Sequence, residues 1–213
     1  FGPGENDANS RDTYVGNFAL TFEPTEDIII TPSIYYQKAD RKETGFVTEW
    51  RPGVDLPAFP ELTSGEAQAS SGQDEVALYS LKAEADLGAA TIISSTAYLD
   101  RTARSIDDGT GFFLDVLGLP ASGFGLPGII DERFVIDVNA KQRAFTQELR
   151  IQSNPGSSPL SYVAGVFYQN SRQSAVEYNL AFDPDLFYLP STNGNVAFGS
   201  DFTRDEQLAF FGQ

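Results

Sequence analysis

The sequence predicts an all-β fold, an antiparallel up-and-down meander that is a partial segment of a transmembrane β-barrel. About seven segments alternate apolar and polar residues with period two, which is the pattern of β-strands. Aromatic residues make up 13% of the chain, with 17 Phe and 9 Tyr, and such rings suit pleated surfaces and membrane interfaces. The connections between the segments are alternately short and long.

Composition excludes several classes of function. The formal net charge is −16, from 30 acidic and 14 basic residues, whereas a nucleic-acid partner requires a basic surface. The chain has no cysteine and no histidine, which removes zinc–thiolate sites, thiolate nucleophiles and the usual general base. No catalytic residue and no cofactor is indicated, so we expect a protein that is not an enzyme. No apolar run approaches the roughly 18 to 20 residues of a membrane helix.

The first two strands are expected at residues 14–22 and 28–38. In the first, Tyr14, Phe18 and Leu20 share one face because side chains of a strand alternate between its two sides. The acidic segment 23–27 between the strands is a short turn. Pro32 lies inside the second strand and cannot donate to a β-ladder, so we expect a bulge or distortion there.

The third and fourth strands are expected at 75–87 and 90–104, joined by a tight turn at Gly88 and Ala89. The third strand has the clearest alternation of the chain. Its apolar face consists of Ala77, Tyr79, Leu81, Ala83, Ala85 and Leu87, and its opposite face of Ser80, Lys82, Glu84 and Asp86.

The last three strands are expected at 144–153, 160–178 and 205–213, with a turn at 154–159 between the first two of them. Three long loops near 39–73, 105–143 and 179–204 are rich in Gly, Pro and Ser and have no sustained periodicity.

Tight turns at one end and long loops at the other are typical of membrane β-barrels, whose two rims face different compartments. In that arrangement the apolar face of each strand faces lipid and the polar face lines a wet lumen. The alternative is a soluble β-sandwich with insertions, although such folds seldom have long loops on one side only.

Three segments resemble a signature of TonB-dependent receptors. They are FTQELRIQS at 145–153, PLSYVAGVFYQ at 159–169 and DEQLAFFGQ at 205–213. In that family, a strand ending in an acidic-Leu-Arg unit leads through a periplasmic turn to an aromatic-x-x-Gly strand, and a later strand carries Ala-x-Phe-Gly. The segments 27–37 and 96–101 (TAYLDR) also look like barrel strands of these receptors.

The resemblance implies a receptor in the outer membrane of a Gram-negative bacterium, with a barrel of about 22 strands around an N-terminal plug. Residues 1–213 would form part of the barrel, and the plug that binds TonB would lie outside them. The implied partners are a small-molecule ligand (a ferric siderophore, cobalamin or a glycan), TonB through the plug, and outer-membrane lipid with lipopolysaccharide. A secreted soluble β-sandwich or lectin-like carbohydrate-binding protein is the alternative.

The candidate ligand contacts lie in or beside the long loops. They are Trp50, Phe59, Arg104, Phe112, Phe113, Phe124 and Tyr188. Large rings on loops can line a vestibule and stack against a ligand, or they can pack the loops against one another.

Five arginines also lie at or near the expected junctions of strands and loops. Arg41, Arg51, Arg101, Arg104 and Arg143 suit an anionic ligand, lipopolysaccharide phosphates or salt bridges with neighbouring acids.

No metal site is expected. The acidic pairs Asp107–Asp108 and Asp183–Asp185 lack the rest of a calcium-binding loop, and turn chemistry explains them.

Overall fold

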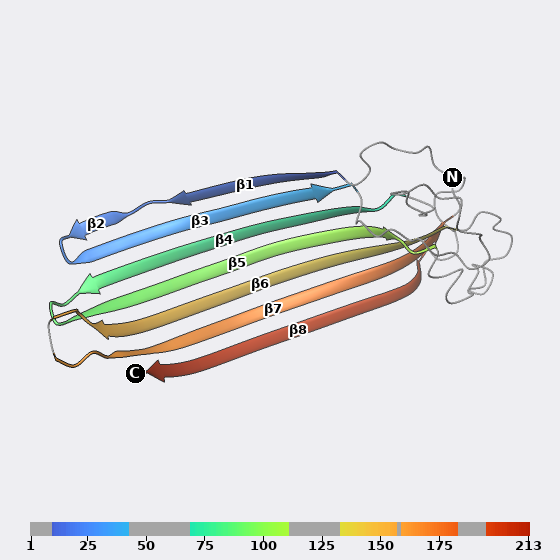
Figure 1. The fold of residues 1–213 in the computed structure, drawn as a ribbon. Coiled ribbons are helices and arrows are strands. Elements are labelled where there is room, and N and C mark those ends of the chain that lie inside the picture. The colour runs from blue at the N-terminus through green and yellow to red at the C-terminus, as the bar shows by residue number, and fades with distance from the viewer. Residues whose placement is uncertain (1–9, 43–68, 111–132, 157–158, 183–194) are drawn as a thin grey trace, which may run out of the picture.

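The structure is a computed structural model that describes residues 10–42, 69–110, 133–156, 159–182 and 195–213. These residues form one antiparallel sheet with 8 strands (Figure 1). The strands are β1 (Arg11–Ala19), β2 (Phe22–Thr25), β3 (Ile28–Arg41), β4 (Ser71–Asp86), β5 (Ala90–Asp108), β6 (Arg133–Ser153), β7 (Val163–Phe182) and β8 (Asn195–Gly212).

The predicted all-β antiparallel meander is confirmed. The strands lie in the order β1-β3-β4-β5-β6-β7-β8, and the short strand β2 pairs with β3. Within the described residues, β1 and β8 are the two edges and do not pair with each other, so the sheet is not closed. The β2–β3 and β4–β5 connections (26–27 and 87–89), the end of β6 and the start of β7 lie at one end of the sheet, which we call the turn end. The other end, where β3, β5 and β7 finish, is the loop end.

The first expected strand is divided in two, because β1 ends at Ala19 and β2 begins at Phe22. The break lies opposite Pro32. Leu20 donates its N–H to the Pro32 carbonyl at 3.1 Å, but Pro32 has no N–H with which to return the second bond of the pair. The pairing of Pro32 with Leu81 on the other side continues in register. The distortion expected at Pro32 therefore falls in the neighbouring strand.

The long loops are shorter than the sequence predicts, because most strands continue further toward the loop end. Residues 39–41 and 71–73 belong to β3 and β4, and residues 105–108 and 133–143 belong to β5 and β6. Residues 179–182 and 195–204 likewise belong to β7 and β8. On β6, residues 137–143 are polar on the face where 145–151 are mostly apolar, and Ile136 and Val138 lie on the other face. This stretch therefore does not continue the alternation of 144–153.

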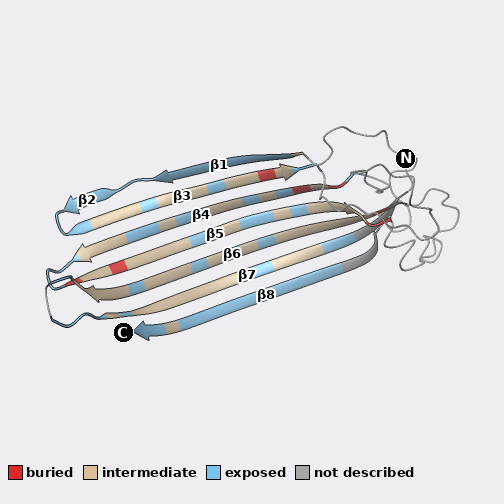
Figure 2. Ribbon diagram, viewed as in Figure 1, coloured by how far each residue is buried: buried red, intermediate tan, exposed pale blue. Residues whose placement is uncertain are grey.

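Few side chains are buried in this sheet. Figure 2 shows intermediate and exposed residues over most of the strands, with buried positions only here and there. The buried hydrophobic residues of the described part are Ala39, Ala90, Ile93 and Phe134. No element of the described chain packs as a second layer on either face of the sheet. The described residues include no helix long and apolar enough to cross a membrane.

Hydrogen bonds join two short connections at the turn end. The Asn154 amide donates to the Asp86 carboxylate at 2.7 Å and to the Gly88 carbonyl at 3.1 Å. Asp86 also accepts the Gly88 N–H at 2.7 Å, and Gly88 has a φ of 83°, which favours glycine. The Thr91 hydroxyl donates to the Asn154 side-chain carbonyl at 2.6 Å. One asparagine therefore holds the β4–β5 turn against the end of β6.

Candidate functional site

The two faces of the sheet differ in chemistry, as the register of the strands determines. Residues paired across antiparallel strands point to the same face, so the pairs Tyr79 with Tyr98 and Tyr98 with Phe145 define one face. We call it the aromatic face. The opposite face, which we call the polar face, includes the pair Ser33 with Ser80.

The aromatic face carries an apolar band in the half of the sheet nearer the turn end. Its large members are Phe18, Ile30, Ile34, Leu81, Ile92, Leu149, Ile151, Val166, Leu208 and Phe210. Several of them are exposed: Leu81 and Leu149 are each 45% exposed and Leu208 is 61% exposed. Contiguous apolar surface of this kind marks a site of contact with a membrane or another protein.

A row of aromatic residues borders the band on its loop-end side. Tyr79, Tyr98 and Phe145 lie directly opposite one another on β4, β5 and β6, and the rings of Phe145 and Tyr168 are 6.4 Å apart. Tyr36 of β3 and Tyr168 of β7 donate their hydroxyls to Glu75 at 3.1 Å and Glu206 at 3.2 Å. Both glutamates lie further toward the loop end, so these rings have an apolar side and a polar tip.

Three polar residues interrupt the apolar band on β5 and β6. The Thr96 hydroxyl donates to the Gln147 side-chain carbonyl, and the Gln147 amide donates to the Ser94 hydroxyl and the Glu148 carbonyl, both at 3.0 Å. Each of the three side chains therefore has a partner within the sheet. Such pairing lowers the cost of polar groups in apolar surroundings.

The polar face carries mostly hydrophilic side chains across the same half of the sheet, although Ile29, Ile93, Phe167 and Phe211 also lie on it. Ser33 and Ser80 share a hydrogen bond, and Lys82 pairs with Glu84 at 2.8 Å. This face also carries Thr31, Gln37, Ser95, Glu148, Arg150, Gln152, Gln169 and Gln207. The contrast between the faces that the sequence predicts for residues 77–87 thus extends over neighbouring strands.

Arg101 and Asp74 form a bidentate pair on the polar face, on the loop-end side of the aromatic row. Arg101 Nε and Nη2 donate to the two Asp74 oxygens at 2.9 and 2.7 Å. The hydrogen bond from Arg101 lowers the pKa of Asp74, and the charges of Arg101, Arg41 and Arg11 lower it further against the opposing effect of burial. The same pair raises the pKa of Arg101.

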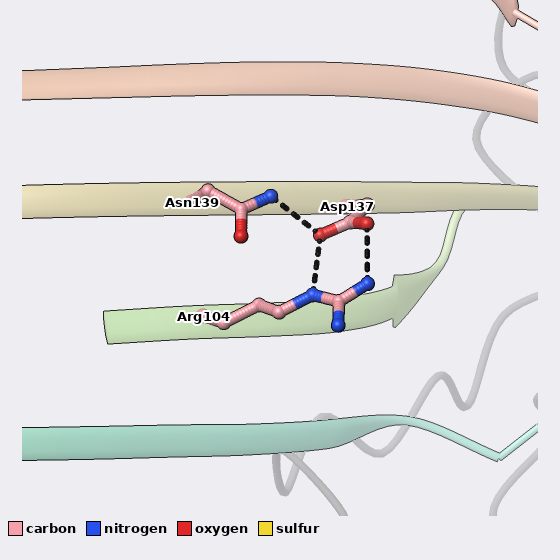
Figure 3. A network of polar contacts seen from close by, with 3 residues as sticks. All are labelled: Arg104, Asp137 and Asn139. Carbon is pink, nitrogen blue, oxygen red and sulfur yellow. Dashed lines mark hydrogen bonds and ion pairs between the residues drawn. The ribbon is translucent and has the colours of Figure 1, made fainter. Parts of the chain in front are cut away.

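Arg104 is the one candidate ligand contact that lies in the described part of the chain. It is in β5 on the aromatic face, and its Nε and Nη2 donate to the Asp137 carboxylate at 3.0 and 2.8 Å (Figure 3). Asn139 donates to the same carboxylate at 2.9 Å. Two guanidinium donors are therefore engaged within the sheet, while the expected contact between Arg104 and a ligand stays a prediction.

The other candidate ligand contacts lie outside the described residues. They are Trp50, Phe59, Phe112, Phe113, Phe124 and Tyr188. Arg51 and the Asp183–Asp185 pair also lie outside them. Of the remaining junction arginines, Arg101 pairs with Asp74 and Arg143 pairs with Asp100 at 3.1 Å.

Asp108 accepts a hydrogen bond from the backbone of Thr110 at 2.9 Å, as a residue that caps a turn does. Among the described residues, no group of three or more acidic side chains is arranged to hold a metal ion.

No protein-family model, curated protein or solved structure matches this chain.

Proposed function

We propose that this chain is part of the barrel of a TonB-dependent outer-membrane receptor that takes up a scarce nutrient such as a ferric siderophore. The observation that carries the proposal is the sheet with two chemically different faces. Its aromatic face exposes an apolar band bordered by tyrosines, as the lipid-facing side of a membrane barrel does. Its polar face suits a wet lumen.

The position of the resembling segments supports the same proposal. The segment at 145–153 lies in β6, the segment at 159–169 leads into β7, and the segment at 205–213 lies in β8. These strands are consecutive neighbours in the sheet. The order of the motifs in the sequence is therefore also their order in space.

The extent of the band fits a bilayer. On β4 the apolar residues of the aromatic face run from Ala77 to Ala85, and Leu87 lies just beyond the strand. A membrane strand crosses the hydrocarbon with about 9 to 11 tilted residues. Asp74 and Arg101 lie beyond this stretch, on the loop-end side. In this proposal the loop end is extracellular and the turn end is periplasmic, the protein acts in nutrient transport, and it is not an enzyme.

Spin labels test the orientation directly, because these 213 residues contain no cysteine. In full-length protein in lipid vesicles, a nitroxide at Leu81→Cys is expected to collide with dissolved oxygen, which concentrates in lipid. A nitroxide at Ser80→Cys, the adjacent residue on the other face, is expected to collide with a water-soluble nickel chelate. A soluble β-sandwich would bury Leu81 away from both reagents, and that result would refute the proposal.

Uptake tests the function itself. A strain that lacks the gene is expected to lose growth on one limiting nutrient among ferric siderophore, cobalamin and glycan, and a tonB deletion is expected to give the same loss. Re-expression of the full-length protein restores growth only when TonB is present. Normal growth on all three nutrients, or restoration without TonB, contradicts the assignment.

A further inference from the structure

Three arginines lie in one row on the aromatic face. Arg143 of β6 lies opposite Arg172 of β7, and Arg172 lies opposite Arg204 of β8. Figure 1 shows these three strands as neighbours at one side of the sheet. Directly opposed residues of antiparallel strands have Cβ atoms about 4.5 to 5.5 Å apart. The fold therefore holds three positive charges side by side.

The acidic residues around this row do not neutralise it. Arg143 pairs with Asp100 at 3.1 Å and Arg204 pairs with Glu206 at 3.1 Å. Arg172 lies between the two pairs and forms no ion pair with any residue that the structure describes. The Arg143 and Arg204 side chains remain 65% and 50% exposed despite their pairs, and Arg172 is also exposed.

The three arginines of the row repel one another, and a bound anion would offset this repulsion. Like charges directly opposite one another destabilise a sheet, and this chain has only 14 basic residues against 30 acidic ones. Guanidinium groups present a planar fork of donors that matches a phosphate group. The row therefore has the charge and the donor geometry to bind phosphate on its exposed side.

The position of the row indicates where that phosphate comes from. On β6, Arg143 follows Phe145 as the next residue of the aromatic face toward the loop end. Two residues of a strand span about 7 Å, so the arginines lie one step beyond the aromatic row. If the aromatic residues mark the edge of the hydrocarbon, this is the depth of the lipid headgroups.

We propose that Arg143, Arg172 and Arg204 bind phosphate groups of lipopolysaccharide in the outer leaflet. This inference rests on the proposed function, because it requires the aromatic face to face lipid. Arg172 is the central residue of the site, since it has no competing carboxylate among the described residues. Arg143 and Arg204 contribute the donors that their carboxylate partners leave open.

The test measures binding of fluorescent lipopolysaccharide to the purified full-length protein in detergent. Arg172→Gln is expected to weaken binding about tenfold, the loss of one charge-assisted contact. It leaves the fold intact because no described ion pair is removed. Arg11→Gln, an exposed arginine on the polar face of β1, is the matched control and should bind as the wild type does.

Two further measurements identify the ligand. Lipopolysaccharide stripped of its phosphates is expected to bind wild type and Arg172→Gln equally well. Equal competition by inorganic phosphate at the same concentration would overturn the lipid source, and unchanged binding by Arg172→Gln would overturn the site. With lipid-exposed labels at Leu81→Cys, either failure refutes only this inference. A label at Leu81→Cys that is shielded from lipid refutes the proposed function as well.

Discussion

Asn154, at the start of the β6–β7 connection, donates a hydrogen bond to the Asp86 carboxylate at the end of β4, 2.7 Å away. Asn154→Ala removes this bond together with those to Gly88 and Thr91. We expect a loss of about 1 to 3 kcal/mol in the free energy of unfolding, because the polar groups of Asp86, Gly88 and Thr91 that bonded to Asn154 lose this partner. Urea titration of the full-length protein in vesicles measures it. Asn17→Ala, on an exposed edge strand, should lose much less.

Gly165 lies under the ring of Phe211, its register partner on β8. A Cβ at this position would overlap the Phe211 ring and approach the Leu149 carbonyl oxygen to 2.8 Å. We therefore expect Gly165→Val to cost about 1 to 3 kcal/mol through overpacking. A Cβ added at Gly16 would meet no atom within 4 Å, so Gly16→Val is the control. Equal urea midpoints for both variants would show that Phe211 moves aside freely.

Leu81 and Ser80 are adjacent in β4 but point to opposite faces. In the proposed orientation, Leu81→Arg places a charge against lipid and is expected to lose about 2 to 4 kcal/mol of folding free energy in vesicles. Ser80→Arg places the same charge on the polar face and should cost little. The mobility of unheated protein on SDS gels reports the folded fraction of each variant. A larger loss for Ser80→Arg would reverse the assignment of the faces.

Gln147 partners both Thr96 and Ser94 within the apolar band. Gln147→Ala leaves two hydroxyls without their partner, which is expected to cost about 1 to 3 kcal/mol. Replacing all three residues by apolar ones, as Ser94→Ala, Thr96→Val and Gln147→Leu together, should recover most of that loss because no polar group is left unpaired. If the triple variant is less stable than Gln147→Ala in urea titration, the polar cluster is needed for another reason.

The Arg101 hydrogen bond that lowers the pKa of Asp74 makes part of the stability depend on pH. A depressed carboxyl pKa contributes stability above the pKa of the unfolded chain, and this contribution disappears as the pH falls through the folded pKa. We expect Asp74→Asn to lower the urea midpoint at pH 7 and to have progressively less effect toward pH 3. The exposed Asp201 is the control position. A constant difference between wild type and Asp74→Asn at all pH values contradicts this linkage.

The sequence predicts the turn-end half of the strands well and the loop-end half poorly. Residues 75–87 alternate between one apolar and one polar face, which determines both the strand and the side that each residue occupies. Near the loop end of β6, Asp137 and Lys141 lie on the aromatic face while Ile136 and Val138 lie on the polar face. The apolar residues thus change face along β6, so this segment does not continue the alternation of 144–153 and the sequence alone does not identify it as part of the same strand.

Sites that depend on register are not visible in the sequence. Arg143, Arg172 and Arg204 are far apart along the chain, and only the pairing of β6, β7 and β8 brings them into one row. The sequence places Arg101 and Arg104 near a strand end, but it does not reveal that Asp74 and Asp137 occupy their guanidinium groups. The alternation of short and long connections, by contrast, follows from the spacing of turn residues and agrees with the sheet.

The strands are longer than a bilayer crossing would require. β6 has 21 residues and extends about 70 Å at 3.4 Å per residue, whereas the hydrocarbon core is about 30 Å thick. In the proposed orientation, roughly half of this wall stands above the cell surface as a collar. In that orientation the residues of the collar lie outside the constraint that lipid imposes on side chains lower down.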